Sequence, residues 1–307
     1  MVATVPRKTW SSRPSRSLSS RASLNPCFQH SDRAAYVQCQ RCDRPLCSEC
    51  MVEAPVGFHC PVCVDQARRS RPTPRTTFGA KAGIERPLVT ISVIVVCAVI
   101  YLFQILPIYS SQLATSLPDI TRQFAYAPIY TSEIGLNFEP WRMLTSALLH
   151  SPQQAAHLFF NMIALWFVGR AMEPEIGRLR FGALLLLSAF GGSVAVMYWS
   201  DPLTPTVGAS GAVFGLFGAL FVLLRSSGSE TGGVVALLAI NMVFSFLVPQ
   251  ISWQGHLGGL VTGAVVATVY AYAPKRQRGL WQSLGLILIA ALLLLATWWG
   301  IPQVTVF

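Results

Sequence analysis

The stretch TVGASGAVFGLFGAL, residues 206–220, holds one serine, Ser210, at the beginning of a run of small and apolar residues. Glycines at short spacing are common where membrane helices pack closely, because the missing side chain lets two backbones approach. Ser210 is therefore either one more small packing residue or a nucleophile at the mouth of a helix. The remainder of the sequence decides between these two interpretations.

Composition places the chain in a membrane. Of its 307 residues, 52% are hydrophobic and 12% are charged, about half the charged fraction of a typical soluble domain. Several apolar runs reach the roughly 20 residues that cross a bilayer. We therefore predict an all-α polytopic membrane protein with seven spans, of which the second and fifth are the shortest. The runs lie at 88–106, 155–172, 181–199, 207–224, 233–248, 255–273 and 280–299.

Changes in composition divide the chain into five parts. A Ser/Arg-rich segment without an apolar core is typical of disorder, and a Cys/His-rich segment indicates a small metal-binding module. The predicted parts are a disordered basic tail at 1–24, a zinc-binding module at 25–64, a basic flexible linker at 65–87, a six-helix membrane core at 88–275, and an extra C-terminal membrane helix with a short tail at 276–307.

Basic residues sort to one side of the predicted spans. Of the 23 Lys and Arg residues, 21 fall on one side, and only Arg122 and Arg142 fall on the other. The positive-inside rule then predicts a cytoplasmic N-terminus and a C-terminus outside. Topology and anionic lipid explain the net charge of +10 more simply than nucleic acid does. We expect a bacterial cell membrane, and the transit-like N-terminal composition leaves an organelle membrane as the alternative.

Eight soft ligands follow a repeated spacing in the zinc-binding module. Four pairs, each with two residues between the ligands, suit two tetrahedral Zn²⁺ ions. Because successive pairs are close in sequence, we predict an interleaved arrangement. In it, pairs one and three hold one ion, and pairs two and four hold the other. His59 is an alternative ligand to Cys60. The predicted ligands are Cys27, His30, Cys39, Cys42, Cys47, Cys50, Cys60 and Cys63.

The alternative for these cysteines is a set of disulfides, which a reducing cytoplasm disfavours. The cross-braced pattern resembles a B-box-type zinc finger, and both sites look closed, so the zinc is expected to be structural. The module is expected to bind a cytoplasmic protein or to regulate the chain. Nucleic-acid binding is disfavoured, because no basic helix with interleaved aromatic residues follows the module.

The chemistry available inside the membrane is narrow. The sequence has no His-Glu-x-x-His motif, which excludes the common metalloprotease arrangement. No predicted span contains Asp or Glu, and the three lysines, Lys8, Lys81 and Lys275, lie outside the spans. Serine with histidine as its base remains, as a dyad rather than a triad because no carboxylate is near.

Ser210 and His256 stand at the outer ends of two predicted spans, so they lie at similar depth. Small residues on both helices permit the close approach that a serine–histidine hydrogen bond requires. His157 and Asn161 are four apart on one face of a third span and could donate hydrogen bonds into the same cavity, as an oxyanion hole. The predicted packing glycines are Gly208, Gly211, Gly215, Gly259 and Gly263.

As a set, five motifs within residues 85–275 resemble the rhomboid intramembrane serine proteases: WRMLTSALLH, HLFFN, GRAMEPEIG, GASGAVFGLFGA and GHLGGLVTG. The resemblance implies a six-helix core with one added C-terminal helix at 280–299. It implies that a Ser210–His256 dyad, which needs no catalytic cofactor, hydrolyses peptide bonds of transmembrane protein substrates near the outer membrane face. His157, Asn161 and the backbone N–H of Ser210 would form the oxyanion hole.

The same resemblance implies supporting roles. Trp141–Arg142 would stabilise the outer loop, and Glu173 would tie helix ends together by hydrogen bonds. Phe214, at a position that is often tyrosine, would stack on the catalytic histidine. His150 is expected to support the loop rather than to take part in catalysis.

Two other function classes remain in view. A catalytically silent rhomboid relative would use the same fold as a binding module for membrane proteins. A transporter or channel would use the polar cluster as a pathway. The absence of carboxylates in the predicted spans and of an evident inverted repeat argues against the transporter.

Overall fold

The computed structural model describes residues 25–70, 74–80, 83, 86–109, 116, 118–132 and 138–304. The predicted disordered tail at 1–24 and the last three residues lie outside the described residues. The chain divides into two compact units, Met1–Pro72 and Thr73–Phe307, and each is described by itself.

The first unit contains very little regular structure. Two antiparallel pairs of two-residue strands, β1 (Val37–Gln38) with β2 (Pro45–Leu46) and β3 (Val52–Glu53) with β4 (Phe58–His59), precede helix α1 (Pro61–Ser70). Isolated pairs this short are not stable on their own. The buried cluster of the unit consists of Leu46 and cysteines: Cys27, Cys39, Cys47, Cys50, Cys60 and Cys63. The fold of this unit therefore depends on what the cysteines bind.

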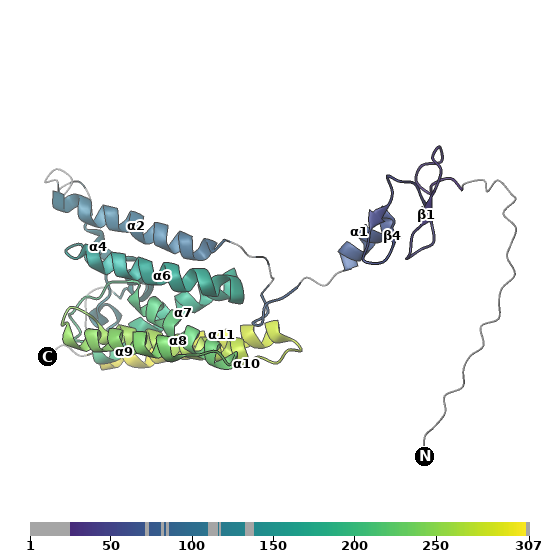
Figure 1. The fold of residues 1–307 in the computed structure, drawn as a ribbon. Helices are drawn as coiled ribbons and strands as arrows, with labels where there is room; N and C mark the ends of the chain where they lie inside the picture. The colour runs from purple at the N-terminus through teal and green to yellow at the C-terminus, as the bar shows by residue number, and fades with distance from the viewer. Residues whose placement is uncertain are drawn as a thin grey trace, which may run out of the picture. The chain divides into compact units, whose positions relative to one another are not determined.

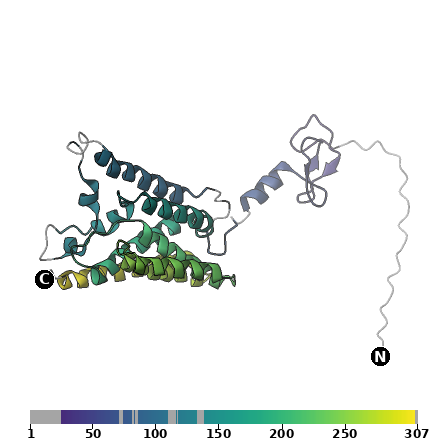
Figure 2. The ribbon, with the colours of Figure 1, turned by 60° about the vertical axis from the view of Figure 1, so that its left-hand side comes forward.

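Among its described residues, the second unit has seven long helices, one at each predicted apolar run. They pack side by side as a bundle (Figures 1 and 2). The helices are α2 (Leu88–Tyr109), α6 (Ala155–Ile176), α7 (Arg178–Trp199), α8 (Ser210–Ser226), α9 (Gly232–Leu247), α10 (Trp253–Tyr272) and α11 (Arg278–Gly300). The prediction of an all-α polytopic membrane protein is confirmed, with six core helices and one added at the C-terminal end.

Helix length and burial separate the centre of the bundle from its edge. By length and composition, α2, α6, α7 and the α11 segment are each able to cross a membrane, whereas α8 and α9 are shorter. The most apolar window of α7 is 67% buried, against 22% for α2. Nine of the 17 residues of α8 are also buried, among them Leu216 and Phe217. A short helix at the centre is shielded by its neighbours, so it need not match the bilayer thickness by itself.

The long connection between α2 and α6 is structured where it is described. It contains α4 (Ile120–Phe124), η1 (Pro128–Thr131), α5 (Arg142–Thr145) and η2 (Ser146–Leu148). Arg142 is 7% exposed and forms an ion pair with Glu139. Its guanidinium also donates to the carbonyls of Arg122 and Ala125 and lies 3.9 Å from the Tyr130 ring centroid. Arg142 therefore holds this connection together, in agreement with the structural role implied for it.

Helix α6 is longer than the apolar run predicts. It continues to Ile176 and so includes Glu173, which is fully buried. The carboxylate accepts hydrogen bonds from the backbone N–H groups of Val89 and Thr90, at 2.9 Å each, and from the Thr90 hydroxyl at 2.8 Å. These N–H groups begin α2 and have no carbonyl partner within their own helix. The predicted tie between helix ends is confirmed, and its partners explain why a buried carboxylate is tolerated.

The segment predicted as linker is partly ordered. Residues 65–70 continue helix α1, and residues 75–80 pack against the membrane unit, where Phe78 is 8% exposed and joins the main apolar cluster. Because the Phe78 side chain is buried, residues 75–80 do not form the flexible linker that the sequence predicts.

Candidate functional site

Ser210 begins helix α8, as the sequence predicts. Gly208, two residues earlier, has φ of +131°, a backbone conformation that residues with a side chain rarely adopt. Its N–H donates to the carbonyl of Ser146 at 3.0 Å. This bond joins the beginning of α8 to the outer connection and fixes the position from which Ser210 projects. The sequence predicts Gly208 as a packing glycine, and the structure places it before the helix, where it turns the chain into α8.

Helices α8 and α10 approach each other through glycine. A Cβ atom built on Gly259 would lie 2.0 Å from the carbonyl oxygen of Gly211, and one built on Gly263 would lie 2.0 Å from that of Gly215. No real side chain fits such spaces. Gly211 follows Ser210 directly, and Gly259 is three residues after His256, so the closest approach of the two helices lies beside the predicted dyad.

His256 is held on two sides. Its ring stacks on Phe214, with the ring centroids 4.0 Å apart and the planes inclined by 15°. Its Nδ1 atom lies 2.6 Å from the Ser245 hydroxyl of helix α9. His256 is 7% exposed and Ser245 is 2% exposed. The stacking of Phe214 on the histidine that the resemblance implies is therefore present. Ser245 of α9 holds the ring from a second side.

The hydrogen bonds around Ser245 assign the protons of His256. The Ser245 hydroxyl donates its single hydrogen to the carbonyl of Asn241 at 2.7 Å. It must then accept the hydrogen of the short contact to His256, so Nδ1 of His256 carries the proton. In neutral imidazole the other nitrogen, Nε2, is left without a hydrogen and can act as a base.

His157 shows the opposite arrangement. The backbone N–H of Ser151 donates to Nδ1 of His157 over 3.5 Å, so the proton of the neutral ring belongs on Nε2. A Cβ atom built on Gly208 would lie 2.8 Å from this Nε2 and 3.6 Å from the Ser210 hydroxyl oxygen. His157 therefore presents a donor to the space beside Ser210. The glycine at position 208 keeps that space open.

Asn161 lies one turn below His157 on α6 and is 7% exposed. Its side-chain nitrogen donates to the carbonyl of His157 at 2.8 Å. An amide nitrogen has two hydrogens, so one remains for another acceptor. His157 thus lies beside Ser210 at the beginning of α8, and Asn161 follows one turn later on the His157 helix, partly engaged by that helix.

His150 supports the outer connection. It is fully buried, and its backbone exchanges two hydrogen bonds with the side chain of Gln104, at 3.1 and 2.9 Å. Its ring meets that of His157 edge to face, with centroids 5.2 Å apart. Burial and, less strongly, the nearby His157 lower the pKa of His150 to about 3, so the ring is neutral. A buried neutral ring with both backbone groups engaged fits the structural role expected for it.

Sequence reasoning missed Ser245. The residue lies in the fifth apolar run, and Asn241 and Ser245 are four apart on one helix face. Polar residues in a membrane helix are expected to mark a function, and this pair was the available signal. The contact between Ser245 and His256 exists only because α9 packs next to α10, and the sequence does not reveal that packing.

The eight predicted zinc ligands form two groups in the first unit. Cys27, His30, Cys47 and Cys50 make one group, and Cys39, Cys42, Cys60 and Cys63 make the other, with all ligand atoms of a group within 4.8 Å of one another. These are the interleaved sets predicted from the spacing. Cys60, rather than His59, belongs to the second group, because its sulfur lies with those of Cys39, Cys42 and Cys63.

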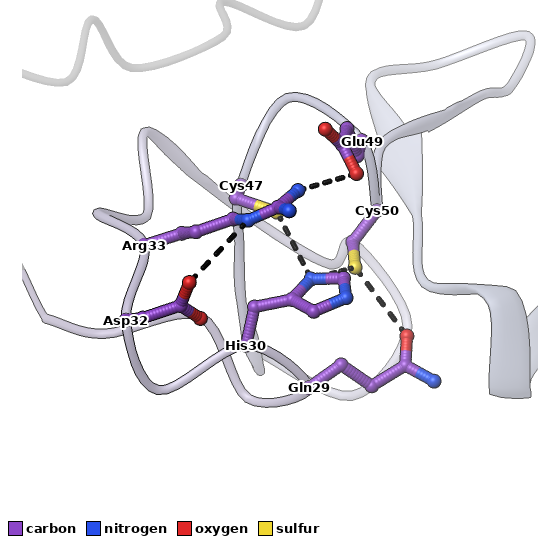
Figure 3. A network of polar contacts seen from close by, with 7 residues as sticks. All are labelled: Gln29, His30, Asp32, Arg33, Cys47, Glu49 and Cys50. Carbon is purple, nitrogen blue, oxygen red and sulfur yellow. Dashed lines mark hydrogen bonds and ion pairs between the residues drawn. The ribbon is translucent and has the colours of Figure 1, made fainter.

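The distances within both groups fit a tetrahedral metal. Four sulfur ligands at the usual zinc distance of about 2.3 Å would be about 3.8 Å apart. The Cys42 and Cys60 sulfurs are 3.7 Å apart. Nδ1 of His30 lies 3.5 Å from the Cys47 sulfur and 3.4 Å from that of Cys50. Figure 3 shows the His30 ring pointing toward both sulfurs. Four protein ligands leave no open position, so each group suits a structural rather than a catalytic ion.

Thiolate formation is favoured at Cys27 and Cys47 of the first group and at Cys39 of the second, because hydrogen bonds lower the pKa of each. Burial raises the pKa of Cys27 and of Cys39, but hydrogen bonds from neighbouring backbone N–H groups outweigh it and bring the pKa of each to about 6. The thiolate is the form that binds metal. Beside the first group, Arg33 forms ion pairs with Glu49 and Asp32 and ties together the loops that carry His30 and Cys47 (Figure 3).

Comparison with known proteins identifies the membrane unit. The Rhomboid domain profile matches residues 137–273. The chain is 37% identical over 166 residues to the rhomboid protease GluP of Bacillus subtilis (strain 168), which covers 52% of this chain and 30% of GluP. It is 34% identical over 147 residues to the putative rhomboid protease YdcA of the same strain, which covers 46% of this chain and 72% of YdcA.

Not every relative is described as active. The chain is 34% identical over 150 residues to the inactive RHOMBOID-like protein 8 of Arabidopsis thaliana, which covers 46% of this chain and 41% of that protein. The chain thus spans less than half of GluP and of the plant protein, but more than two thirds of YdcA. With the helical bundle and the match over its core, these likenesses show that the chain belongs to the rhomboid family.

Proposed function

We propose that this rhomboid is an intramembrane serine endopeptidase in which Ser210 is the nucleophile and His256 its base. The observation that carries the proposal is the opposite hydrogen bonding of two histidine rings, His157 beside the beginning of α8 and His256 stacked on Phe214 of that helix. Hydrogen bonds leave Nε2 of His256 free to accept a proton and give Nε2 of His157 a proton to donate. A serine hydrolase needs one acceptor and at least one donor beside its hydroxyl.

The first half of the reaction forms an acyl-enzyme. The Ser210 oxygen attacks the carbonyl carbon of the scissile bond while its proton passes to Nε2 of His256. The carbonyl oxygen becomes an oxyanion, and the tetrahedral intermediate collapses as the same proton passes to the leaving nitrogen. The second half repeats these steps with water as the nucleophile and releases the carboxylate product and free Ser210.

Three donors are proposed for the oxyanion. They are Nε2–H of His157, the second amide hydrogen of Asn161, and the backbone N–H of Ser210. As the first residue of α8, Ser210 is one of the residues whose N–H has no carbonyl partner in the helix. Donors already in place cost no reorganisation when the negative charge develops.

The proposed substrates are transmembrane proteins, because the site lies at one end of an apolar bundle whose surroundings are lipid. The distribution of basic residues supports a cytoplasmic N-terminus and a site near the outer face of the membrane. A bacterial cell membrane is proposed over an organelle membrane, because GluP and YdcA are bacterial. An organelle membrane is the alternative, because the chain is also similar to plant proteins, one of which is named mitochondrial.

The first unit is proposed to hold two structural Zn²⁺ ions and to bind a cytoplasmic protein. Each zinc ion would cross-link the loops that carry its four ligands, and the thiolates would offset the charge of the ion. The catalytic steps above use residues of the second unit alone, so zinc has no part in them.

Labelling with a fluorophosphonate probe tests the proposal without a known substrate. Wild type should react, and neither Ser210→Ala nor His256→Ala should. Ser226→Ala is the matched control, because Ser226 lies on the same helix at the end away from the site and its hydroxyl donates only to Leu223; it should label like wild type. Failure of the folded wild type to label would favour the alternative, a catalytically silent rhomboid that binds membrane proteins.

A further inference from the structure

Residues 75–80 form a tight turn against the membrane unit, at the end opposite Ser210. The Thr76 N–H donates to the carbonyl of Ala80 at 2.9 Å, and the Gly79 N–H donates to the carbonyl of Thr76 at 3.0 Å. The Phe78 carbonyl accepts from Gln282 of α11, and the Thr76 hydroxyl donates to the carbonyl of Glu175 of α6. The turn is therefore fixed to helices that are far apart in sequence.

Three arginines converge on this turn. Arg75 donates to the carbonyl of Gly79 at 3.0 Å, Arg278 donates to that of Thr77 at 2.5 Å, and Arg180 donates to that of Ile176 at 3.2 Å. A Cβ atom built on Gly79 would lie 3.0 Å from Cδ of Arg278 and 3.8 Å from a terminal nitrogen of Arg180. One side chain comes from the turn, one from α7 and one from α11.

The positive charges of this cluster are uncompensated within the described residues. The bonds above go to neutral carbonyls, and the ion pairs of the described membrane unit involve Arg142 and Arg178 instead. Arg75 and Arg278 both repel Arg180 electrostatically. In addition, Nε of Arg278 is buried and has no hydrogen-bond partner among the described residues. Buried donors are normally satisfied, so an acceptor is expected here.

Two helix beginnings add to the positive potential. Helices α7 and α11 both begin at this end, and neither has an acidic residue in its first turn or a side-chain cap. The N-terminus of a helix carries about half a positive charge, which normally attracts acidic residues. Here Arg180 and Arg278 lie in the first turn of these two helices, which places like charges together.

We propose that Arg75, Arg180 and Arg278 form a binding site for a phosphate group, supplied by the headgroup of an anionic membrane lipid. Guanidinium groups present paired donors that match phosphate oxygens, and the charge-assisted bonds are strong. Basic pockets between membrane helices are suited to anionic headgroups. The site lies where bundle helices begin, at the depth of lipid headgroups. A soluble phosphate ester has the same chemistry and is the other possible source.

A bound phosphate would join the turn to α7 and α11. The expected consequence is resistance to unfolding in anionic lipid, because the lipid binds the assembled site and not the unfolded chain. This inference rests on the membrane fold and does not depend on proteolytic activity.

Thermal unfolding of the full chain in detergent micelles tests the site. Dioleoyl phosphatidylglycerol should raise the midpoint more than dioleoyl phosphatidylcholine, which has the same acyl chains and no net charge. Each arginine removed should weaken the binding of phosphatidylglycerol about five-fold, so Arg180→Gln/Arg278→Gln should bind it about 25-fold less tightly. The matched control Arg225→Gln/Arg276→Gln removes two exposed arginines at the same end of the bundle and should retain the effect.

Glycerol phosphate serves as the soluble arm of the experiment. If it stabilises the protein to the same extent and with the same dependence on the cluster, the phosphate site stands and its source is soluble. Equal effects of the two lipids would overturn the site, as would equal losses in the cluster and control variants. Arg75→Gln, which lies outside any helix, provides the same comparison if the double variant fails to fold.

Discussion

The zinc-binding module and the membrane bundle bury reactive side chains in opposite ways. In the module, cysteines make up nearly all of the buried cluster, so the reactive groups are themselves the core. In the bundle, the main cluster consists of apolar side chains from several helices, and Ser210 and His256 lie at its edge without belonging to it. The comparison teaches that a reactive side chain can form the core of a fold, as the cysteines do, or can be positioned by a core made of other residues, as Ser210 and His256 are.

This difference predicts how the two regions respond to damage. A lost ligand should unfold the module, whereas a lost catalytic side chain should leave the bundle folded. The three predictions that follow challenge the comparison, from the largest expected effect to the smallest.

Metal removal should have the largest effect, and only on the module. Structural zinc contributes about 10–16 kcal/mol of folding free energy in small modules, so a strong chelator should unfold residues 25–70. Metal analysis should find two zinc ions per chain before treatment, and limited proteolysis should then cut within the module only.

Cysteine variants provide the control for metal removal. Cys60→Ala should lose one zinc ion, and Cys97→Ala, a buried cysteine of α2 outside both groups, should keep two. A module that stays protected from protease without metal would contradict the idea that the ligands form its core.

Gly259→Ala should disturb the bundle and the site together. The added methyl would lie 2.0 Å from the Gly211 carbonyl oxygen, so α8 and α10 must separate. The expected loss is about 1–3 kcal/mol of unfolding free energy, with a matching loss of probe labelling at Ser210. Thermal unfolding and labelling rate measure the two effects.

Gly182→Ala is the matched control for this substitution. It places a methyl on α7 with no atom within 4 Å, so stability and labelling should both be retained. Wild-type behaviour of Gly259→Ala would show that the two helices do not depend on close contact.

Ser245→Ala should have the smallest effect and should act on chemistry alone. Without the hydroxyl, Nδ1 of His256 loses the acceptor that fixes its proton. Loss of one such hydrogen bond costs about 1–1.5 kcal/mol, so the labelling rate should fall about ten-fold. Its pH profile should also shift, because a hydroxyl that accepts from Nδ1–H stabilises the protonated ring more than the neutral ring, and this difference is lost.

Two further variants separate positioning from simple packing. Ser245→Thr retains the hydroxyl and should recover much of the rate. Thr268→Ala removes a similar bond to a helix carbonyl, far from the site, and should not change the pH profile. An unchanged profile in Ser245→Ala would remove Ser245 from the proposed mechanism.

Much of this architecture could be predicted from sequence because it rests on local signals. Seven apolar runs predict the seven long helices, and pairs of ligands two residues apart predict the two metal-binding groups. The interleaving of the pairs also follows from sequence, because close neighbours in the chain cannot easily place all four ligands around one ion.

The features that sequence missed depend on distant neighbours. The apolar run ends before Glu173, but helix α6 continues because Val89 and Thr90 satisfy the buried carboxylate. The sequence predicts a flexible linker at residues 75–80, but hydrogen bonds from Arg278 and Gln282 of α11 fix this segment against the bundle. Ser245 acquires its role only when α9 brings it to His256.

The clamp on His256 has a stereochemical consequence. With Phe214 against one face of the ring and Ser245 bonded to one edge, the imidazole cannot turn over during a catalytic cycle. In the proposed mechanism the same nitrogen must therefore collect the proton from Ser210 and deliver it to the departing amine. The departing strand of the substrate must then leave past His256, on the α10 side of Ser210. Under that proposal, the direction in which a polypeptide lies across the site is set by the two side chains that hold the imidazole.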